Sequence, residues 1–516
     1  MPTHSDAVRL NLEFYKKQAK SLLKSAQARE DTALGRIARH ANPSNELPAL
    51  HHAQLTIARE QGFPSWPKFQ SFIKQSQLDF QGQVAAFIEA ATSDYRRAES
   101  LLAQHPQIAH AGFYVALVLG EHQHVAQAVS GNPALAKEKG GPQNCEPLLY
   151  VCFSRYANPR HDQARAAALT ETAGILLGHG ANADAVVLAD DPPHSPLSCL
   201  YGASGLNNNL ALTEVLLNAG ANSNDNESLY HSTEHEDLAC MRLLLARGAR
   251  PAATNALKHM LDRDHFEGVR LLLAAGADPN ETNERGETAL HWAVWRGRCT
   301  PVIAALLDAG AGINAQRKDG RTAYSLAVLG GPTETIELLK SRGADTLLSP
   351  LDRFVQSCGQ ATPAELDRIL ATRPDFSSVP GSRRLLPDLA VSHSTQAVRA
   401  LLAAGVPIDS RGEWGATALH WACWKGYADI VKLLLDQGAP LIIEDEQFHA
   451  TPSGWFSHGV ENCEERQGDY PEVARLLIAA KAKFAATDVP TGNPEVDAVF
   501  RAHNLLSLPL QAPSTI

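Results

Sequence analysis

Apolar residues recur along this chain in short stretches with helical spacing, and these stretches end in the same way. Val302, Ile303, Leu306 and Leu307 form one such stripe, which stops at a glycine followed by an alanine. Positions i, i+1, i+4 and i+5 lie on one face of an α-helix, and a glycine just beyond them favours the end of that helix. The pattern predicts a buried helix face followed by a tight chain reversal.

The same ending returns along most of the chain. Its glycines are separated by 28 to 40 residues, apart from one gap of 62 residues that contains a degenerate copy at Leu366–Phe376. The glycines are Gly180, Gly220, Gly248, Gly276, Gly310, Gly343, Gly405 and Gly438. A phrase that recurs at such intervals predicts stacked helix pairs, because one pair alone cannot bury its apolar face.

The two best copies share a twelve-residue phrase, at Gly286–Gly297 and Gly415–Gly426, that agrees at nine positions. Thr288 stands where its hydroxyl can cap the first helix of the pair. Longer spacing predicts two insertions, near Tyr201–Asn209 and at Gly459–Pro471.

These phrases resemble the ankyrin repeat, whose hallmark is a Thr-Pro-Leu-His tetrapeptide. Alanine replaces the proline in both best copies, whereas Thr451 and Pro452 keep the proline but lack the leucine and histidine. The resemblance covers roughly four-fifths of the chain in about eleven or twelve units. It implies an all-α solenoid of helix-turn-helix units that binds another protein through a concave groove. It also implies a structural role for His291 and His420.

The N-terminal segment has a different pattern. Asn11–Gln27 predicts an amphipathic helix, and Leu55–Ile73 contains a turn at Gly62 followed by a second helix opened by Trp66 and Pro67. Such segments resemble those that precede ankyrin arrays in some bacterial proteins. We expect a small N-terminal helical cap that covers the exposed apolar face of the first repeat.

Six segments are therefore expected. They are the cap at 1–78, degenerate repeats at 79–145, repeats at 146–346, eroded repeats that form a hinge at 347–391, repeats at 392–488, and a closing helix and tail at 489–516. Five prolines interrupt the eroded stretch, so it should open first in hydrogen exchange.

Composition narrows the classes of function. The net charge is −10 and no Lys/Arg-rich run occurs, which argues against nucleic-acid binding. No stretch of about 18 apolar residues occurs, so we expect no insertion into a membrane. The eight cysteines are scattered without a CxxC pair, which favours a reducing cytoplasm. We expect a monomer with no cofactor, bound metal or catalytic residues.

Partner contacts are expected at two kinds of position. Trp295 with Arg296, and Trp424 with Lys425, end the first helices, and in the ankyrin pattern these positions face the groove. Large aromatic and arginine side chains are typical of interface hot spots. The hairpin tips form the second kind of position, with Glu284, Arg285, Glu287, Lys318, Asp319, Arg321, Glu413 and Trp414.

Other chemistry is weakly indicated. His231 and His235 have the spacing of two metal ligands on one helix face, but no third ligand stands at a known spacing. Two alternatives to a protein-binding scaffold stay open. One is an enzyme or small-molecule sensor with its site in the cap or at 459–471, and the other is an inhibitor or immunity-like protein that blocks one enzyme.

Overall fold

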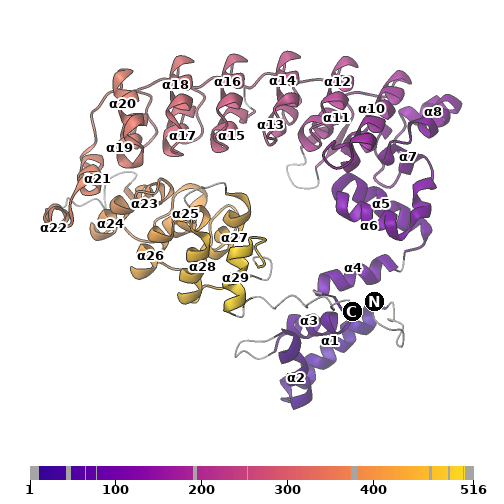
Figure 1. Cartoon of the computed structure of the whole chain (residues 1–516), viewed down its shortest axis with the longest axis horizontal. Helices are drawn as coiled ribbons and strands as arrows, with labels where there is room; N and C mark the ends of the chain where they lie inside the picture. Colours follow the sequence, from indigo (N-terminus) through magenta and orange to yellow (C-terminus); the bar gives the residue numbers. More distant parts are fainter. Residues whose placement is uncertain are drawn as a thin grey trace, which may run out of the picture. The chain divides into compact units, whose positions relative to one another are not determined.

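The computed structural model describes residues 11–41, 48–63, 65–76, 78–189, 195–252, 254–372, 382–463, 468–485, 489–503 and 505. The regular secondary structure of these residues is helical apart from one two-stranded hairpin, so the expected all-α fold is confirmed (Figure 1). The chain divides into two compact units, Met1–Arg247 and Gly248–Ile516, hereafter units 1 and 2.

Unit 1 contains fourteen described α-helices, one hairpin and several short turns of tighter or wider helix. Its α-helices are α1 (Leu12–Gln27), α2 (Asp31–Ala41), α3 (Leu50–Glu60), α4 (Trp66–Ser76), α5 (Phe80–Ser93), α6 (Tyr95–Gln104), α7 (Phe113–Leu119), α8 (His122–Gly131), α9 (Pro147–Phe153), α10 (Gln163–Gly178), α11 (Cys199–Tyr201), α12 (Leu210–Asn218), α13 (Ser228–Ser232) and α14 (Ala239–Ala246). The 3-10 helices are η1 (Pro106–His110), η2 (Pro133–Ala136) and η3 (Arg155–Ala157), and η4 (Gly202–Leu206) is a π-helical turn.

Unit 2 consists of helix pairs and one short 3-10 turn, η5 (Glu413–Gly415). Its helices are α15 (Ala256–Asp262), α16 (Phe266–Ala274), α17 (Ala289–Trp295), α18 (Thr300–Asp308), α19 (Ala323–Gly330), α20 (Thr333–Ser341), α21 (Pro350–Gln360), α22 (Pro363–Ala371), α23 (Ser382–Val391), α24 (Thr395–Ala403), α25 (Ala418–Lys425), α26 (Ala428–Asp436), α27 (Pro452–Asn462), α28 (Tyr470–Ala479) and α29 (Pro494–Ala502).

The expected N-terminal cap has a hydrophobic core of its own. Helices α1 to α4 bury Tyr15, Leu22, Ile37, Phe69 and other apolar residues against one another. Tyr15 and Phe69 meet edge to face with ring centroids 4.8 Å apart. The segment thus buries its main apolar face internally, rather than spreading it over the first repeat as the sequence led us to expect.

The 40-residue interval between Gly180 and Gly220 contains a hairpin. Strands β1 (Val186–Leu188) and β2 (Pro196–Ser198) are antiparallel and pair Val187 with Leu197. From Gly180 to the helix cap Ser198 there are 18 residues, against 12 from Gly276 to the cap Thr288. From cap to closing glycine there are 22 residues in both units. The expected insertion at Tyr201–Asn209 is therefore wrong, because the extra residues precede the helix.

The eight glycines that set the period share one backbone conformation. Their φ angles lie between 81° and 90°, in the left-handed region that side chains disfavour. At Gly310 an added Cβ would meet no atom within 4 Å, so the backbone angle rather than crowding requires glycine there. This conformation reverses the chain after each second helix.

Each of the two best copies begins with a reciprocal cap. In α25 the Thr417 N–H donates to Nδ1 of His420 at 3.1 Å, and Nε2 of the same ring lies 3.1 Å from the carbonyl oxygen of Ala450 in the next hairpin. Thr288 and His291 form the same cap at α17. Both imidazoles are buried, so they join one helix pair to its loop and neighbour in the neutral form.

Acid is expected to destabilise unit 2 through these imidazoles. Burial lowers the pKa of His420 to about 4, and burial also lowers the pKa of His291. In the unfolded chain each imidazole takes up a proton near pH 6.5, so stability is full above that pH and falls as pH drops toward 4. We expect a loss of roughly 2–3 kcal/mol for His420 between pH 7 and 4.5.

Urea unfolding followed by tryptophan fluorescence measures this loss, because six of the seven tryptophans lie in unit 2. The variant His420→Asn should lose less stability than the parent over the same pH interval. An unchanged pH dependence in that variant would contradict the assignment.

The stack in unit 2 changes direction at α21 and α22. Elsewhere the first helix of each pair packs on the first helix of the next, as in α15–α17–α19 and α23–α25–α27. In contrast, α21 packs on α24, the second helix of the following pair. The chain turns there, and α23 and α25 return to the side of α17 and α19 (Figure 1).

This change of direction falls in the stretch expected to be eroded. α21 spans 11 residues where α17 spans 7, and α23 contains Pro387. Residues 373–381 lie outside the described part of the chain. The expectation that 347–391 opens first in hydrogen exchange stays a prediction.

Candidate functional site

The change of direction brings the two best copies into contact with each other. Trp295 of α17 meets Trp421 of α25 edge to face, with ring centroids 6.0 Å apart. The Arg296 guanidinium lies over the rings of Trp292, Trp295 and Trp421 at 4.9, 4.7 and 5.8 Å. We call helices α15–α20 and helices α23–α28 the two arms of unit 2. Trp295 is 7% exposed, so it and Arg296 face the other arm of unit 2 and not an open groove as expected.

The hairpin tips of the two arms also meet, through buried charges. Arg317 lies 3.1 Å from Glu287, 2.7 Å from Asp319 and 3.5 Å from Asp388 on α23. Burial raises the pKa of Asp388 despite the arginines beside it. Arg285 of one arm lies 3.4 Å from Glu413 of the other. These ion pairs fasten the arms together.

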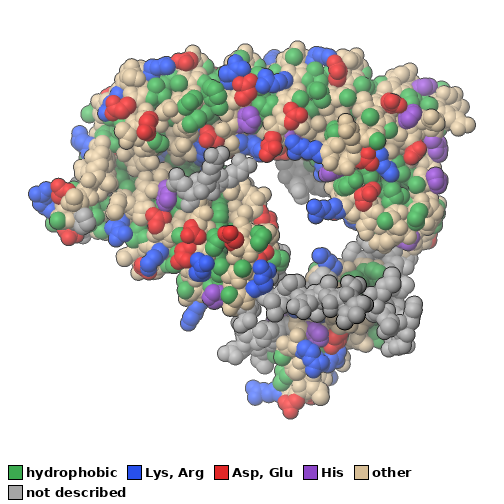
Figure 2. Space-filling model, viewed as in Figure 1, with side chains coloured by type: hydrophobic (Ala, Val, Ile, Leu, Met, Phe, Trp, Pro, Cys, Tyr) green, Lys and Arg blue, Asp and Glu red, His purple; other side chains and the backbone are tan. Residues whose placement is uncertain are grey.

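The twelve expected contact residues thus fall into three groups. Those that are buried are Glu287, Trp295, Arg321, Glu413 and Lys425, together with the side chain of Arg296. Those that are partly buried are Arg285, Asp319 and Trp424. Those that are exposed are Glu284, Lys318 and Trp414. On the face drawn in Figure 2, charged side chains of both signs are interspersed over the helix pairs, as on a solvated surface.

An aromatic pocket opens between α25 and α27. It is a cavity of about 330 Å³ between the η5 turn, α25, the hairpin at 441–450 and α27. Its lining residues are Trp414, Trp424, Phe448, Ala450, Gly454, Trp455 and His458. We call this cavity the aromatic pocket. Trp414 and Phe448 are 36% and 59% exposed, so large apolar side chains stand at its mouth.

Trp414 is held at the pocket by a constrained backbone. Its φ is 55°, a conformation that bulky side chains rarely adopt. The Trp414 carbonyl accepts from the N–H of Glu446 at 2.8 Å, and Arg411 donates to the carbonyl oxygens of Gly415 and Glu444 at 2.8 and 3.0 Å. Its ring stacks on Trp421, with centroids 5.4 Å apart. Backbone strain of this kind persists only where its surroundings enforce it.

Asp445 orders the opposite wall of the pocket. Its buried carboxylate accepts from the N–H groups of Gln447, Phe448 and Ala450, and from Nε1 of Trp455 at 2.9 Å. Burial alone raises the pKa of Asp445, but the donated hydrogen bonds hold it below its usual value. One charged group therefore fixes both the loop that carries Phe448 and the ring of Trp455.

Comparison with known protein families identifies the repeated unit. A family model described as ankyrin repeats in three copies matches residues 257–349, and one described as ankyrin repeats in many copies matches residues 386–435. The chain carries ankyrin repeats. Both matched segments lie in unit 2 and contain its two best copies, and such repeats are protein-binding modules.

Curated relatives match less than a third of this chain, and the matched stretch spans 5–15% of their own length. The Caenorhabditis elegans "Transient receptor potential cation channel subfamily A member 1 homolog" is 28% identical over 165 residues, which are 30% of this chain and 13% of that protein. Human Rabankyrin-5 is 28% identical over 175 residues, 28% of this chain and 15% of that protein. The C. elegans "Ankyrin repeat and KH domain-containing protein mask-1" is 30% identical over 152 residues, 30% of this chain and 5% of that protein. These relatives are eukaryotic and do not support the resemblance of the N-terminal segment to bacterial proteins.

Solved ankyrin domains also match. The ankyrin repeat domain of Bcl-3 is 25% identical, covering 44% of this chain and 91% of that chain with a TM-score of 0.22. The human ASB11 ankyrin repeat domain is 22% identical, covering 49% of this chain and 99% of that chain with a TM-score of 0.22.

The aromatic pocket is built from equivalent positions of two successive ankyrin repeats. Trp414 precedes the cap Thr417 by three residues, as Phe448 precedes the cap Thr451. Trp421 and Trp455 both follow their caps by four residues, and Trp424 and His458 by seven. Stacked repeats place equivalent positions side by side, so the walls of the pocket follow from the repeat register.

Sequence reasoning found two of the seven lining residues of this pocket. It proposed Trp414 and Trp424 but missed Phe448, Trp455 and His458, because that repeat lacks the leucine and histidine of the hallmark. The 34-residue interval that separates Trp421 from Trp455 was a signal that could have found them.

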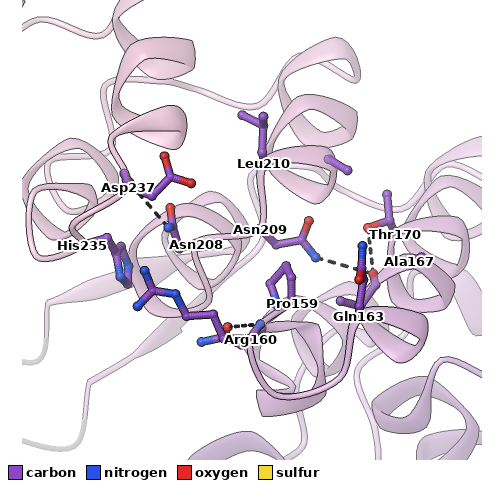
Figure 3. Close-up of a pocket in the computed structure, with 13 residues that line it drawn as sticks. Pro159, Arg160, Gln163, Ala167, Thr170, Asn208, Asn209, Leu210, His235 and Asp237 are labelled. Atoms are coloured by element: carbon purple, nitrogen blue, oxygen red, sulfur yellow. Dashed lines mark hydrogen bonds between the residues drawn. The ribbon is translucent and has the colours of Figure 1, made fainter.

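A second concave site lies in unit 1. It is a polar cavity of about 360 Å³ between the N-terminal ends of α10 and α12. Figure 3 shows Arg160 reaching toward His235 and Asn208, whose Nδ2 lies 3.5 Å from the carbonyl oxygen of Asp237. The Asn209 side chain caps α12 and also bonds to the carbonyl oxygen of Ala157 at 2.8 Å. Much of the polar lining therefore already serves the helix ends.

The two histidines weighed as metal ligands have separate partners. His231 lies 2.9 Å from Glu234 and 3.3 Å from Glu227, whereas Nε2 of His235 lies 2.6 Å from the carbonyl oxygen of Gly205. Helix α13 ends at Ser232, so the two imidazoles do not share one helix face as expected.

Within the described ranges, no group of three or more His, Cys, Asp or Glu side chains is placed to hold a metal ion, and no helix has the length and apolar character to span a bilayer. All eight cysteines are free thiols. Residues 464–467, part of the insertion named as an alternative site, lie outside the described residues.

Proposed function

We propose that this protein is a non-catalytic ankyrin-repeat scaffold that binds another protein through the aromatic pocket of unit 2. The observation that carries the proposal is Trp414, a large aromatic side chain exposed on a left-handed backbone. Such an arrangement costs stability in the free protein, whereas an aromatic side chain in a desolvated interface anchors a partner. Rigid walls also reduce the entropy lost on binding.

The proposed contact surface lies at the aromatic pocket and keeps some of the contact residues that the sequence indicated. Trp414 and Trp424 keep the role that the sequence indicated, and Phe448 joins them. Glu284 and Lys318 stay candidate contacts at the exposed tips of the other arm. Trp295, Arg296 and Glu287 instead support the site by holding the arms together.

The proposed location, oligomeric state and excluded ligands rest mainly on the sequence. We infer a cytoplasmic monomer that binds neither nucleic acid nor a cofactor, from the free thiols and the absence of a basic run. An inhibitor that blocks one enzyme would use the same pocket, and the identity of the captured partner distinguishes the two roles.

Quantitative affinity purification with mass spectrometry tests the site. The variant carrying Trp414→Gly and Phe448→Ala removes both exposed anchors, and glycine accepts the positive φ of position 414. We expect capture of the specific partner to fall by about 30-fold or more, since an interface hot spot contributes about 2 kcal/mol or more.

Ile442→Ala is the matched control, because Ile442 is 80% exposed in the same hairpin and does not line the pocket. It should capture the partner as the parent does, and circular dichroism should show equal helicity in all three proteins. Unchanged capture by the double variant would refute the site.

A further inference from the structure

We propose that the aromatic pocket receives one bulky apolar side chain from a partner segment in which lysine or arginine residues flank that side chain. This inference rests on the proposed function of the pocket and adds the chemical class of the ligand. It follows from the interior of the pocket and from the charges around its mouth.

The interior suits a neutral side chain better than a cation. The rings of Trp414, Phe448 and Trp455 lie with centroids 5.7, 6.0 and 6.2 Å apart, so they touch one another. An ammonium group held between aromatic faces needs a gap that these rings fill. The nearby carboxylate of Asp445 is already occupied by four N–H donors. The remaining space, bounded by Trp424, Ala450 and Gly454, is apolar.

The mouth carries negative charge. Glu444 and Glu446 are exposed beside Trp414 and Phe448, and Glu461 is exposed one helical turn beyond His458 on α27. Arg411 is an exposed cation near Glu446, and its guanidinium donates to two carbonyl oxygens and lies 3.9 Å from Glu446. Lys425 is 8% exposed, and its ammonium lies 5.1 Å from the ring centre of Trp424. The exposed charges that a ligand meets first at the mouth are therefore those of the glutamates.

An acidic rim around an apolar cavity selects its ligand through two independent interactions. Burial of an apolar side chain supplies affinity, and opposite charge steers association and disfavours wrong partners. The same rim repels the phosphates of nucleic acids and of acidic membranes. A cationic segment with an apolar anchor is the partner that makes both interactions.

Selection from a phage-displayed library of random peptides tests the ligand class. The full chain serves as bait, and the variant Gly454→Leu serves as the comparison. An added Cβ at Gly454 would meet only the Ala450 methyl group at 3.4 Å, so the leucine fits the helix and fills the cavity. We expect enriched peptides to share a Leu, Ile, Phe or Trp flanked by Lys or Arg, and the Gly454→Leu bait to lose this enrichment by about tenfold or more.

A separate variant tests the contribution of the acidic rim. The double substitution of Glu446→Lys and Glu461→Lys should retain the apolar anchor in its selected peptides but lose the basic flanks. Leu347→Ala, at a residue 76% exposed elsewhere in unit 2, should select the same peptides as the parent.

The outcomes separate this inference from the proposed function. Acidic or purely polar peptides, enrichment of methylated-lysine peptides in a parallel array, or no enrichment at all would overturn the ligand class. If the affinity-purified partner is still lost on removal of Trp414 and Phe448, the pocket remains the binding site and only its ligand has been misassigned. If that partner is retained, the proposed function itself fails.

Discussion

Replacing Trp421 by alanine is expected to cost unit 2 about 3–5 kcal/mol of folding free energy, the range for a large aromatic residue deleted from a core. Trp421 is 1% exposed and its ring meets Trp295, Trp414, Trp424 and Trp455. The substitution removes a side chain that contacts both Trp295 of the other arm and the rings of the aromatic pocket. Urea unfolding monitored by tryptophan fluorescence measures the loss.

Two comparisons make the Trp421 result specific. Phe448→Ala should cost much less, because that ring is 59% exposed. Trp295→Ala and Trp421→Ala should be non-additive by about 0.5–3 kcal/mol, since the two rings are in contact. Additive losses would mean that the arms do not pack together as described.

Replacing Arg317 by methionine is expected to cost about 3 kcal/mol at pH 7, the low end of the range for breaking a buried ion pair. Three buried carboxylates would lose a cation that they share, while Arg321 and Arg384 stay near them. These carboxylates belong to Glu287, Asp319 and Asp388. Burial raises the pKa of Asp319, and the adjacent Arg317 and Arg321 more than reverse that effect. Without Arg317 the pKa values of Asp319 and Asp388 rise, so these two carboxylates take up protons as the pH falls.

The stability difference between parent and Arg317→Met should therefore shrink between pH 7 and pH 5. Arg342→Met is the matched control, because Arg342 lies 2.6 Å from Asp308 but both side chains are exposed. Exposed pairs contribute about 0.2–1 kcal/mol, so this control should be nearly neutral at both pH values. A pH-independent loss in Arg317→Met would contradict the ion-pair assignment.

Local structure was predictable wherever it depended on neighbouring residues. The stripe at Val302–Leu307 predicted α18, and the phrase around Thr288 and Thr417 predicted capped helices at the observed places. The glycine at the end of each unit adopts positive φ. That reversal was predictable because it needs no contact with a distant part of the chain. The repeat register likewise follows from the sequence, since equal spacing places equivalent residues side by side.

The accessibility of the predicted site was not predictable. Trp295 and Trp424 occupy equivalent positions of their repeats, yet one is buried against the opposite arm and the other lines a pocket. The difference arises far from both residues, where α21 packs on the second helix of the next pair. A single irregular helix contact thus decided which of two similar residues can meet a partner.

The sequence by itself therefore determined the ankyrin repeat, its helices, its caps and its chain reversals, because each depends on contacts within one unit or between neighbouring units. Only the tertiary structure decided that the arms of unit 2 close on each other, which buries Trp295 and leaves Trp414 exposed. Those features depend on the direction in which successive helix pairs stack. Side-chain packing between helices that are distant in sequence sets that direction.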